Sequence, residues 1–99
     1  MLLRKADKTN LIELAKKTFT QPVKIWAYGS RVKGLAHETS DLDLVVIPEK
    51  QEPLKFSDLI QFKERLTESQ IPILVQVVDW HRIPESFREN IKQRYEELL

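Results

Sequence analysis

The chain has 99 residues, of which 41% are hydrophobic and 31% charged, as in soluble globular proteins. This length suits one domain, and we expect a single domain over residues 1–99. The 16 basic and 15 acidic residues nearly balance, which argues against direct nucleic-acid binding because that usually needs a strong basic excess. The absence of cysteine excludes disulfides and thiolate metal sites, and no apolar run approaches the ~20 residues of a membrane span. A cytoplasmic location is therefore expected.

A helix and a strand are expected in the first 30 residues. Apolar residues recur there at helical spacing, namely Leu11, Ile12, Ala15 and Phe19. Asn10 and Glu13 are placed like an N-cap and its reciprocal partner, and Pro22 ends the helix. Residues 23–28 are β-branched and aromatic, which predicts a strand that ends at Gly29.

Two helices and a strand are expected in the middle of the chain. Residues 31–36 can form only a short helix, and residues 37–40 are a polar loop. Residues 42–47 are apolar on both faces after their start, which predicts a central strand. After a loop over residues 48–53, Ser57 is expected to cap a longer helix. The inner face of that helix would consist of Leu59, Phe62 and Leu66.

The last third of the chain predicts a strand followed by a helix. Pro72 opens the strand, which covers residues 73–78, and Pro84 fits the first position of the helix. The apolar stripe of that helix would consist of Phe87, Ile91, Tyr95 and Leu98. The resulting order α-β-α-β-α-β-α predicts an α+β fold, in which a small three-stranded mixed sheet packs against helices.

Asp41 and Asp43 open the predicted central strand. Side chains two residues apart on a strand point to the same face, so these carboxylates should lie side by side. Two neighbouring carboxylates at the start of an apolar strand repel each other, and each loses hydration. A divalent cation would reverse that penalty, and oxygen ligands of this kind suit Mg²⁺. Two aspartates at this spacing, without a further motif, are more often simply exposed to solvent.

Gly29 and Ser30 follow the first predicted strand directly. Glycine permits a tight turn, and the serine hydroxyl with the next free N–H groups makes an anion pocket. Arg31 and Lys33 add cationic groups that could bind a nucleotide. Alone, this is the pattern of an ordinary capped turn. Together with the aspartate pair that follows after ten intervening residues, the Gly29-Ser30 turn predicts a phosphate pocket beside a metal pocket.

Over residues 26–34 and 40–44, the chain resembles the DNA polymerase β-like nucleotidyltransferase superfamily and its minimal branch, the MNT proteins. The resemblance implies an antitoxin that uses Mg²⁺ and transfers AMP from ATP to a tyrosine of a HEPN-domain toxin partner. It also implies that Gly29 and Ser30 hold the triphosphate and that the two aspartates are the catalytic metal ligands. The toxin pairing comes from the resemblance alone.

The chain departs from the superfamily pattern on its third predicted strand. A third carboxylate usually stands there, and this chain has Gln76 instead. An amide carries no charge and cannot act as a base. Asp79 is the nearest carboxylate in sequence, but three residues along a regular strand it points to the opposite face unless a bulge re-aims it.

Two functional interpretations follow from this substitution. In the first, the protein transfers nucleotides, because loss of a general base typically costs 10²–10⁴-fold in rate and not all activity. In the second, it is a catalytically weakened or inactive nucleotidyltransferase-fold protein that neutralises its partner by binding. The sequence does not determine the oligomeric state.

Several other residues have two interpretations. His37 lies in the loop between the two halves of the motif, where a phosphate contact and plain solvation are both open. Neither His37 nor His81 has a second histidine at metal-ligand spacing, which argues against zinc. Trp26, Tyr28 and Trp80 could form an adenine shelf or a protein interface, and core packing is expected for at least one of them.

Overall fold

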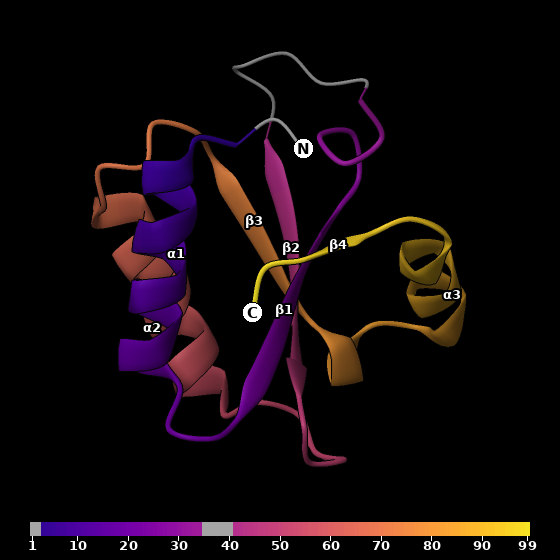
Figure 1. Cartoon of the computed structure of the whole chain (residues 1–99). Coiled ribbons are helices and arrows are strands. Elements are labelled where there is room, and N and C mark those ends of the chain that lie inside the picture. Colours follow the sequence, from indigo (N-terminus) through magenta and orange to yellow (C-terminus); the bar gives the residue numbers. More distant parts are fainter. Residues whose placement is uncertain (1–2, 35–40) are drawn as a thin grey trace.

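The computed structural model describes residues 3–34 and 41–99. In this part of the chain, four strands form one sheet in the order β3-β2-β1-β4. The elements are α1 (Lys5–Thr18), β1 (Val23–Tyr28), β2 (Leu42–Pro48), α2 (Phe56–Glu68), β3 (Val75–Asp79), the 3-10 turn η1 (Trp80–Arg82), α3 (Glu85–Gln93) and β4 (Glu96–Glu97). Figure 1 shows α1 and α2 together on one side of the sheet and α3 on the other. No helix in these residues is long and apolar enough to cross a membrane.

β2 is an inner strand of the sheet, as the sequence predicted. It pairs antiparallel with β1 and parallel with β3, while β4 joins the outer side of β1 antiparallel. Leu44, Val45 and Val46 are 0% exposed, which explains why this strand is apolar on both faces. The α+β fold with a mixed sheet is confirmed, and the sheet contains one short strand that was not predicted.

The main core lies between the sheet and the pair α1–α2. Alternate residues of β1 and β2 point into it, namely Ile25, Ala27, Leu42, Leu44 and Val46. Leu11 and Ala15 of α1 belong to the same cluster. The predicted inner face of α2 is buried there as well, through Leu59, Phe62 and Leu66. The same alternation leaves Asp43 and Gln76 on the opposite face, which we call the open face.

The predicted start of the first helix is wrong. α1 begins at Lys5 with Arg4 as its N-cap, so Asn10 lies inside the helix. The guanidinium of Arg4 donates to the carboxylate of Asp7 at 2.8 and 3.2 Å. This ion pair holds the first turn of a helix whose N-cap, Arg4, is not a typical capping residue.

The predicted start of α2 is wrong by two residues. Its N-cap is Lys55, so Ser57 lies in the first turn of the helix. Just before the N-cap, the backbone N–H of Leu54 donates to a carboxylate oxygen of Asp79 at 2.8 Å. This tertiary hydrogen bond fixes the chain at the start of the helix, which a local capping pattern could not indicate.

The end of the chain differs most from its prediction. α3 stops at Gln93, so Tyr95 and Leu98 do not extend its apolar stripe. The chain instead returns to the free edge of β1, where the N–H of Leu98 donates to the carbonyl of Ile25 at 2.8 Å. This pairing satisfies backbone groups of an edge strand and buries Leu98 in the main core. A non-local strand pairing therefore replaces the predicted continuation of the helix.

Candidate functional site

The two predicted metal ligands lie together on the open face. Tyr28 of β1 pairs with Asp43 of β2, which in turn pairs with Gln76 of β3. These side chains are therefore neighbours across three strands. Asp41 reaches the same place, because its Oδ2 accepts a hydrogen bond from Gln76 Nε2 at 2.9 Å. The structure thus brings Asp41, Asp43 and Gln76 into one cluster at the start of β2.

Gly29 ends β1 directly beside this cluster. Its φ of +82° lies in the left-handed region, which side chains disfavour. A Cβ at this position would collide with Oδ2 of Asp43. The Gly29 carbonyl accepts a hydrogen bond from the N–H of Lys33 at 3.1 Å, which closes the turn. A glycine is therefore needed both for the turn and for the close approach of its backbone to the carboxylate.

The segment after this glycine is a turn and not the predicted short helix. Residues 31–34 form turns, and Gly34 has a φ of +74°, in the left-handed region that favours glycine. The rest of the predicted short helix and the polar loop, including His37, lie in residues 35–40, outside the described residues. The first half of the motif is thus a glycine-flanked turn.

The side chains of this turn differ in exposure. Ser30 and Lys33 are exposed, whereas Arg31 is only 3% exposed. Ser30 and Lys33 can therefore meet an anion from solvent. Arg31 is packed into the protein, although the sequence suggested a second cation at the surface.

The two aspartates are an unfavourable pair by themselves. Burial raises the pKa of Asp43, and the charge of Asp41 raises it further. Burial also raises the pKa of Tyr28 to about 12, with the charge of Asp43 as the second cause. These shifts show negative charge gathered in a half-buried place. Oxygen ligands with such charge suit a hard divalent cation, so the residues present fit Mg²⁺.

Asp79 is not part of this cluster. It is 2% exposed and lies on the face opposite Gln76, as regular strand alternation predicted. Its carboxylate accepts hydrogen bonds from the backbone N–H groups of Leu54 and His81 at 2.8 and 2.9 Å. Arg82 Nε lies 3.3 Å from the same carboxylate. Asp79 therefore joins the loop before α2 to the end of β3.

Its place along the sheet also separates Asp79 from the other two aspartates. Asp79 pairs with Val46 of β2, three residues beyond Asp43, which is about 10 Å along a strand. In the described part of the chain, no group of three or more His, Cys, Asp or Glu residues could hold a metal ion. The cluster therefore offers two carboxylates and one amide.

Trp26 and Tyr28 of β1, both on the open face, pack against other aromatic side chains. The ring of Trp26 stacks on Tyr95, with centroids 3.9 Å apart and planes 12° apart. Trp80 meets the edge of Trp26 at 5.6 Å, and Tyr28 meets Phe87 of α3 at 5.9 Å. These contacts attach α3 and the C-terminal segment to the sheet. Trp26, Tyr28 and Trp80 are only partly buried and lie outside the buried core cluster, so the expected core packing of one of them is not found.

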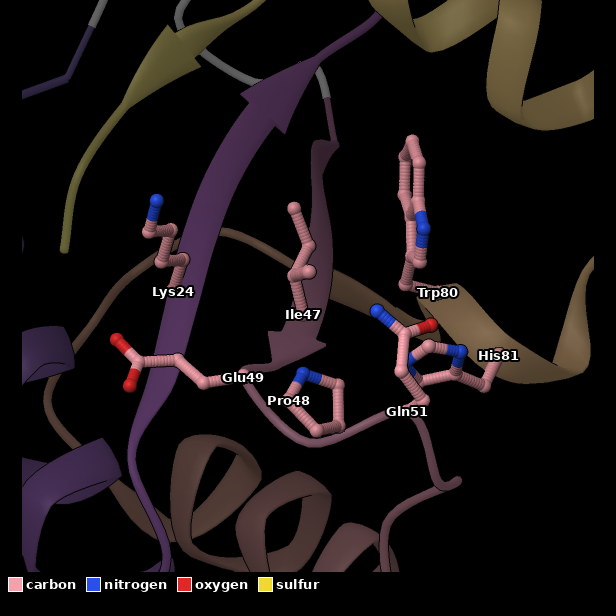
Figure 2. Close-up of a pocket in the computed structure, with 7 residues that line it drawn as sticks. All are labelled: Lys24, Ile47, Pro48, Glu49, Gln51, Trp80 and His81. Atoms are coloured by element: carbon pink, nitrogen blue, oxygen red, sulfur yellow. The ribbon is translucent and has the colours of Figure 1, made fainter.

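A separate hollow lies at the other end of β1 and β2. It has a volume of about 300 Å³ and is lined by Lys24, Ile47, Pro48, Glu49, Gln51, Trp80 and His81. Figure 2 shows these side chains coming from β1, β2, the loop after β2 and the turn after β3. Ile47 lies four residues beyond Asp43, or about 13 Å along the strand. The sequence did not indicate this hollow, because its residues come from separate segments.

Comparisons with known proteins identify the family of this chain. Residues 9–99 match the family described as polymerase beta, nucleotidyltransferase. A Haemophilus influenzae protein named "Probable protein adenylyltransferase MntA" is 38% identical over 91 residues, which are 92% of this chain and 78% of that protein.

Solved structures share the fold at lower identity. A toxin–antitoxin crystal structure with AMP-PNP has a TM-score of 0.77 at 18% identity, covering 93% of this chain and 72% of that one. The complex of a tri-AMPylated Shewanella oneidensis HEPN toxin with MNT antitoxin has a TM-score of 0.74 at 14% identity, covering 98% and 72%. The family match over 91 residues, the MntA relative and the shared fold lead to one conclusion. This chain belongs to the polymerase beta nucleotidyltransferase family, in its minimal nucleotidyltransferase branch.

Proposed function

We propose that this protein is a Mg²⁺-dependent nucleotidyltransferase, an antitoxin that transfers AMP from ATP to a HEPN toxin in the cytoplasm. The observation that carries the proposal is the close approach of Gly29 to Asp43. It sets the turn that would bind phosphate directly against the carboxylates that would bind Mg²⁺. The names of relatives support it, because one is called a protein adenylyltransferase and one complex contains an AMPylated HEPN toxin.

The described residues divide the binding of ATP and Mg²⁺ between them. Ser30 and Lys33, which are exposed, bind phosphate oxygens together with the N–H groups of the turn. Arg31 follows Ser30 directly and adds a positive charge beside the same phosphates, although its side chain is buried. Asp41 and Asp43 hold Mg²⁺, which supplies charge stabilisation on the phosphate oxygens when it is bound.

The reaction is a single displacement at phosphorus. A tyrosine oxygen of the toxin attacks the α-phosphorus of ATP, the bond to the β-phosphate oxygen breaks, and pyrophosphate leaves. The phenolic proton passes to solvent, because Gln76 offers no basic carboxylate at the third position. This chain contributes by holding the phosphates and the two metal-binding carboxylates in one fixed arrangement.

The test is AMP transfer to a HEPN toxin protein that is mixed with this chain, ATP and Mg²⁺. Mass spectrometry should find an AMP-sized addition on that protein, and the Asp41→Asn variant should lose it. Glu64→Gln, which removes a charge from the exposed side of α2, is the matched control and should keep the addition. The proposal fails if the wild-type protein adds no AMP.

A second function is favoured by one observation, the neutral Gln76 beside Asp41. In this alternative the chain retains the fold but neutralises the toxin by binding alone. A tight complex with no AMP on the toxin, and toxin inhibition that survives Asp41→Asn, would support it. Loss of inhibition in that variant would support transfer.

A further inference from the structure

Gln76 stands where a third ligand of the cluster would be. It pairs with Asp43 across the two parallel strands, and its Nε2 donates to Asp41 Oδ2 at 2.9 Å. The side chain is exposed, so it is free of the constraints of the core. An amide at this place binds one carboxylate oxygen through a neutral donor and adds no negative charge.

Charge balance limits how many cations such a cluster can hold. The protein itself supplies two negative charges, which match one divalent cation, and every further ligand charge must come from the nucleotide phosphates. Two-metal sites hold their ions about 3.5–4 Å apart, where the ions repel each other strongly. Additional carboxylates normally offset this repulsion. Here Asp41 and Asp43 would have to serve both ions, with one Asp41 oxygen already accepting from Gln76.

The described residues offer no replacement for the missing carboxylate. Asp79 lies on the other face and is occupied by the N–H groups of Leu54 and His81. Freeing it would leave these donors unpaired in a buried place, which is costly. In residues 3–34 and 41–99, no group of three or more His, Cys, Asp or Glu side chains could hold a metal ion.

We infer that Gln76 restricts this site to one divalent cation, held by Asp41 and Asp43 together with the phosphates of the nucleotide. Gln76 is a specificity-determining residue for metal number, because it puts a neutral hydrogen-bond donor where a second cation needs a carboxylate. The inference rests on the proposed nucleotide site. It adds that the site works with one cation and without a carboxylate on β3.

The experiment counts Mn²⁺ bound per chain by electron paramagnetic resonance, in the presence of a non-hydrolysable ATP analogue. The wild-type protein should bind one Mn²⁺ and show no broadening from a second nearby ion. Gln76→Glu keeps the length of the side chain and adds a carboxylate, so it should bind two and show spin–spin broadening. Gln61→Glu adds the same charge on the exposed side of α2 and should still bind one.

A second measurement does not depend on the analogue. The melting temperature of Gln76→Glu should fall below wild type in EDTA, because three carboxylates then repel each other, and should rise more on adding Mg²⁺. Both measurements are then repeated on Gln76→Asp, whose carboxylate is on a shorter side chain.

Each outcome has a distinct meaning. Two ions in the wild-type protein would overturn the inference and leave the proposed function intact. One ion in both Gln76→Glu and Gln76→Asp would overturn the role given to Gln76. Absence of both Mn²⁺ and analogue binding by the wild-type protein would overturn the proposed function, and the inference with it.

Discussion

Asp43 at the start of β2 and Asp79 at the end of β3 lie on opposite faces of one sheet, and their surroundings differ. Asp79 is almost fully buried, with two backbone N–H donors and the guanidinium of Arg82 around its carboxylate. Asp43 is half-buried beside the like charge of Asp41, and its pKa is raised by burial and by that charge. Folded proteins normally supply donors to buried carboxylates.

This difference separates a structural acid from one available to a ligand. Asp79 stabilises the fold because its charge is compensated from three sides. The charged form of Asp43 is disfavoured by burial and by Asp41, and a bound cation would compensate that charge. The sequence shows two aspartates near strand ends, and only their neighbours show which role each one has. The following predictions test this comparison.

Asp79→Ala should have the largest effect on stability. Removing the carboxylate leaves the N–H groups of Leu54 and His81 and the charge of Arg82 without their partner. We expect the free energy of unfolding, measured by urea denaturation, to fall by about 3–5 kcal/mol. Asp79→Asn should lose less, because the amide keeps one acceptor oxygen. A loss just as large for Asp43→Ala would contradict the comparison.

Gly29→Ala should have an intermediate effect, with Gly34→Ala as its matched control. Both glycines have positive φ, but a Cβ at Gly29 meets Asp43, whereas one at Gly34 meets no described atom within 4 Å. Each should lose about 1 kcal/mol from backbone strain. Gly29→Ala should lose about 1–2 kcal/mol more and weaken Mn²⁺ binding. Equal losses of stability and unchanged Mn²⁺ affinity would argue against close contact between the turn and the carboxylate.

In EDTA, Asp43→Asn should raise the stability of the protein slightly, in contrast to the losses expected of the variants above. Because folding raises the pKa of Asp43 above its ordinary value of 3.8, its stabilising contribution is complete below that value and is lost as pH rises through the folded-state pKa. The melting temperature of the variant should therefore increase relative to that of the wild-type protein as the pH rises from about 4 to 7. The corresponding difference in the free energy of unfolding should stay under about 1 kcal/mol, because the carboxyl group of Asp43 is partly exposed. A gain that shrinks with rising pH would refute this.

The smallest expected effect is on Tyr28. Its pKa is raised to about 12, mainly by burial and secondly by Asp43. Ultraviolet titration in a Tyr95→Phe background follows Tyr28 as the one remaining tyrosine. Asp43→Asn should lower the pKa, yet leave it above 10.0, because burial persists. An unchanged pKa would show that the two side chains do not interact.

Local sequence patterns predicted the two central strands and the buried face of α2. β1 was predicted with its observed bounds, and β2 within one residue, because runs of β-branched residues buried on a sheet are distinctive. The buried face of α2 followed from its helical spacing. The predicted start of α2 and the predicted C-terminal segment were wrong, because a hydrogen bond from Leu54 to Asp79 fixes the first and a strand pairing with β1 replaces the second.

The candidate site shows the same division. Sequence spacing indicated a turn at Gly29-Ser30 and two aspartates on one face, and the resemblance to the superfamily indicated a glutamine in place of a third acid. Tertiary structure decided that the backbone of Gly29 lies against Asp43, that Gln76 donates a hydrogen bond to Asp41, and that donors from Leu54, His81 and Arg82 surround Asp79. The physical reason is that residue type and period determine what a segment can do locally. Charge compensation, by contrast, depends on donors brought from distant parts of the chain.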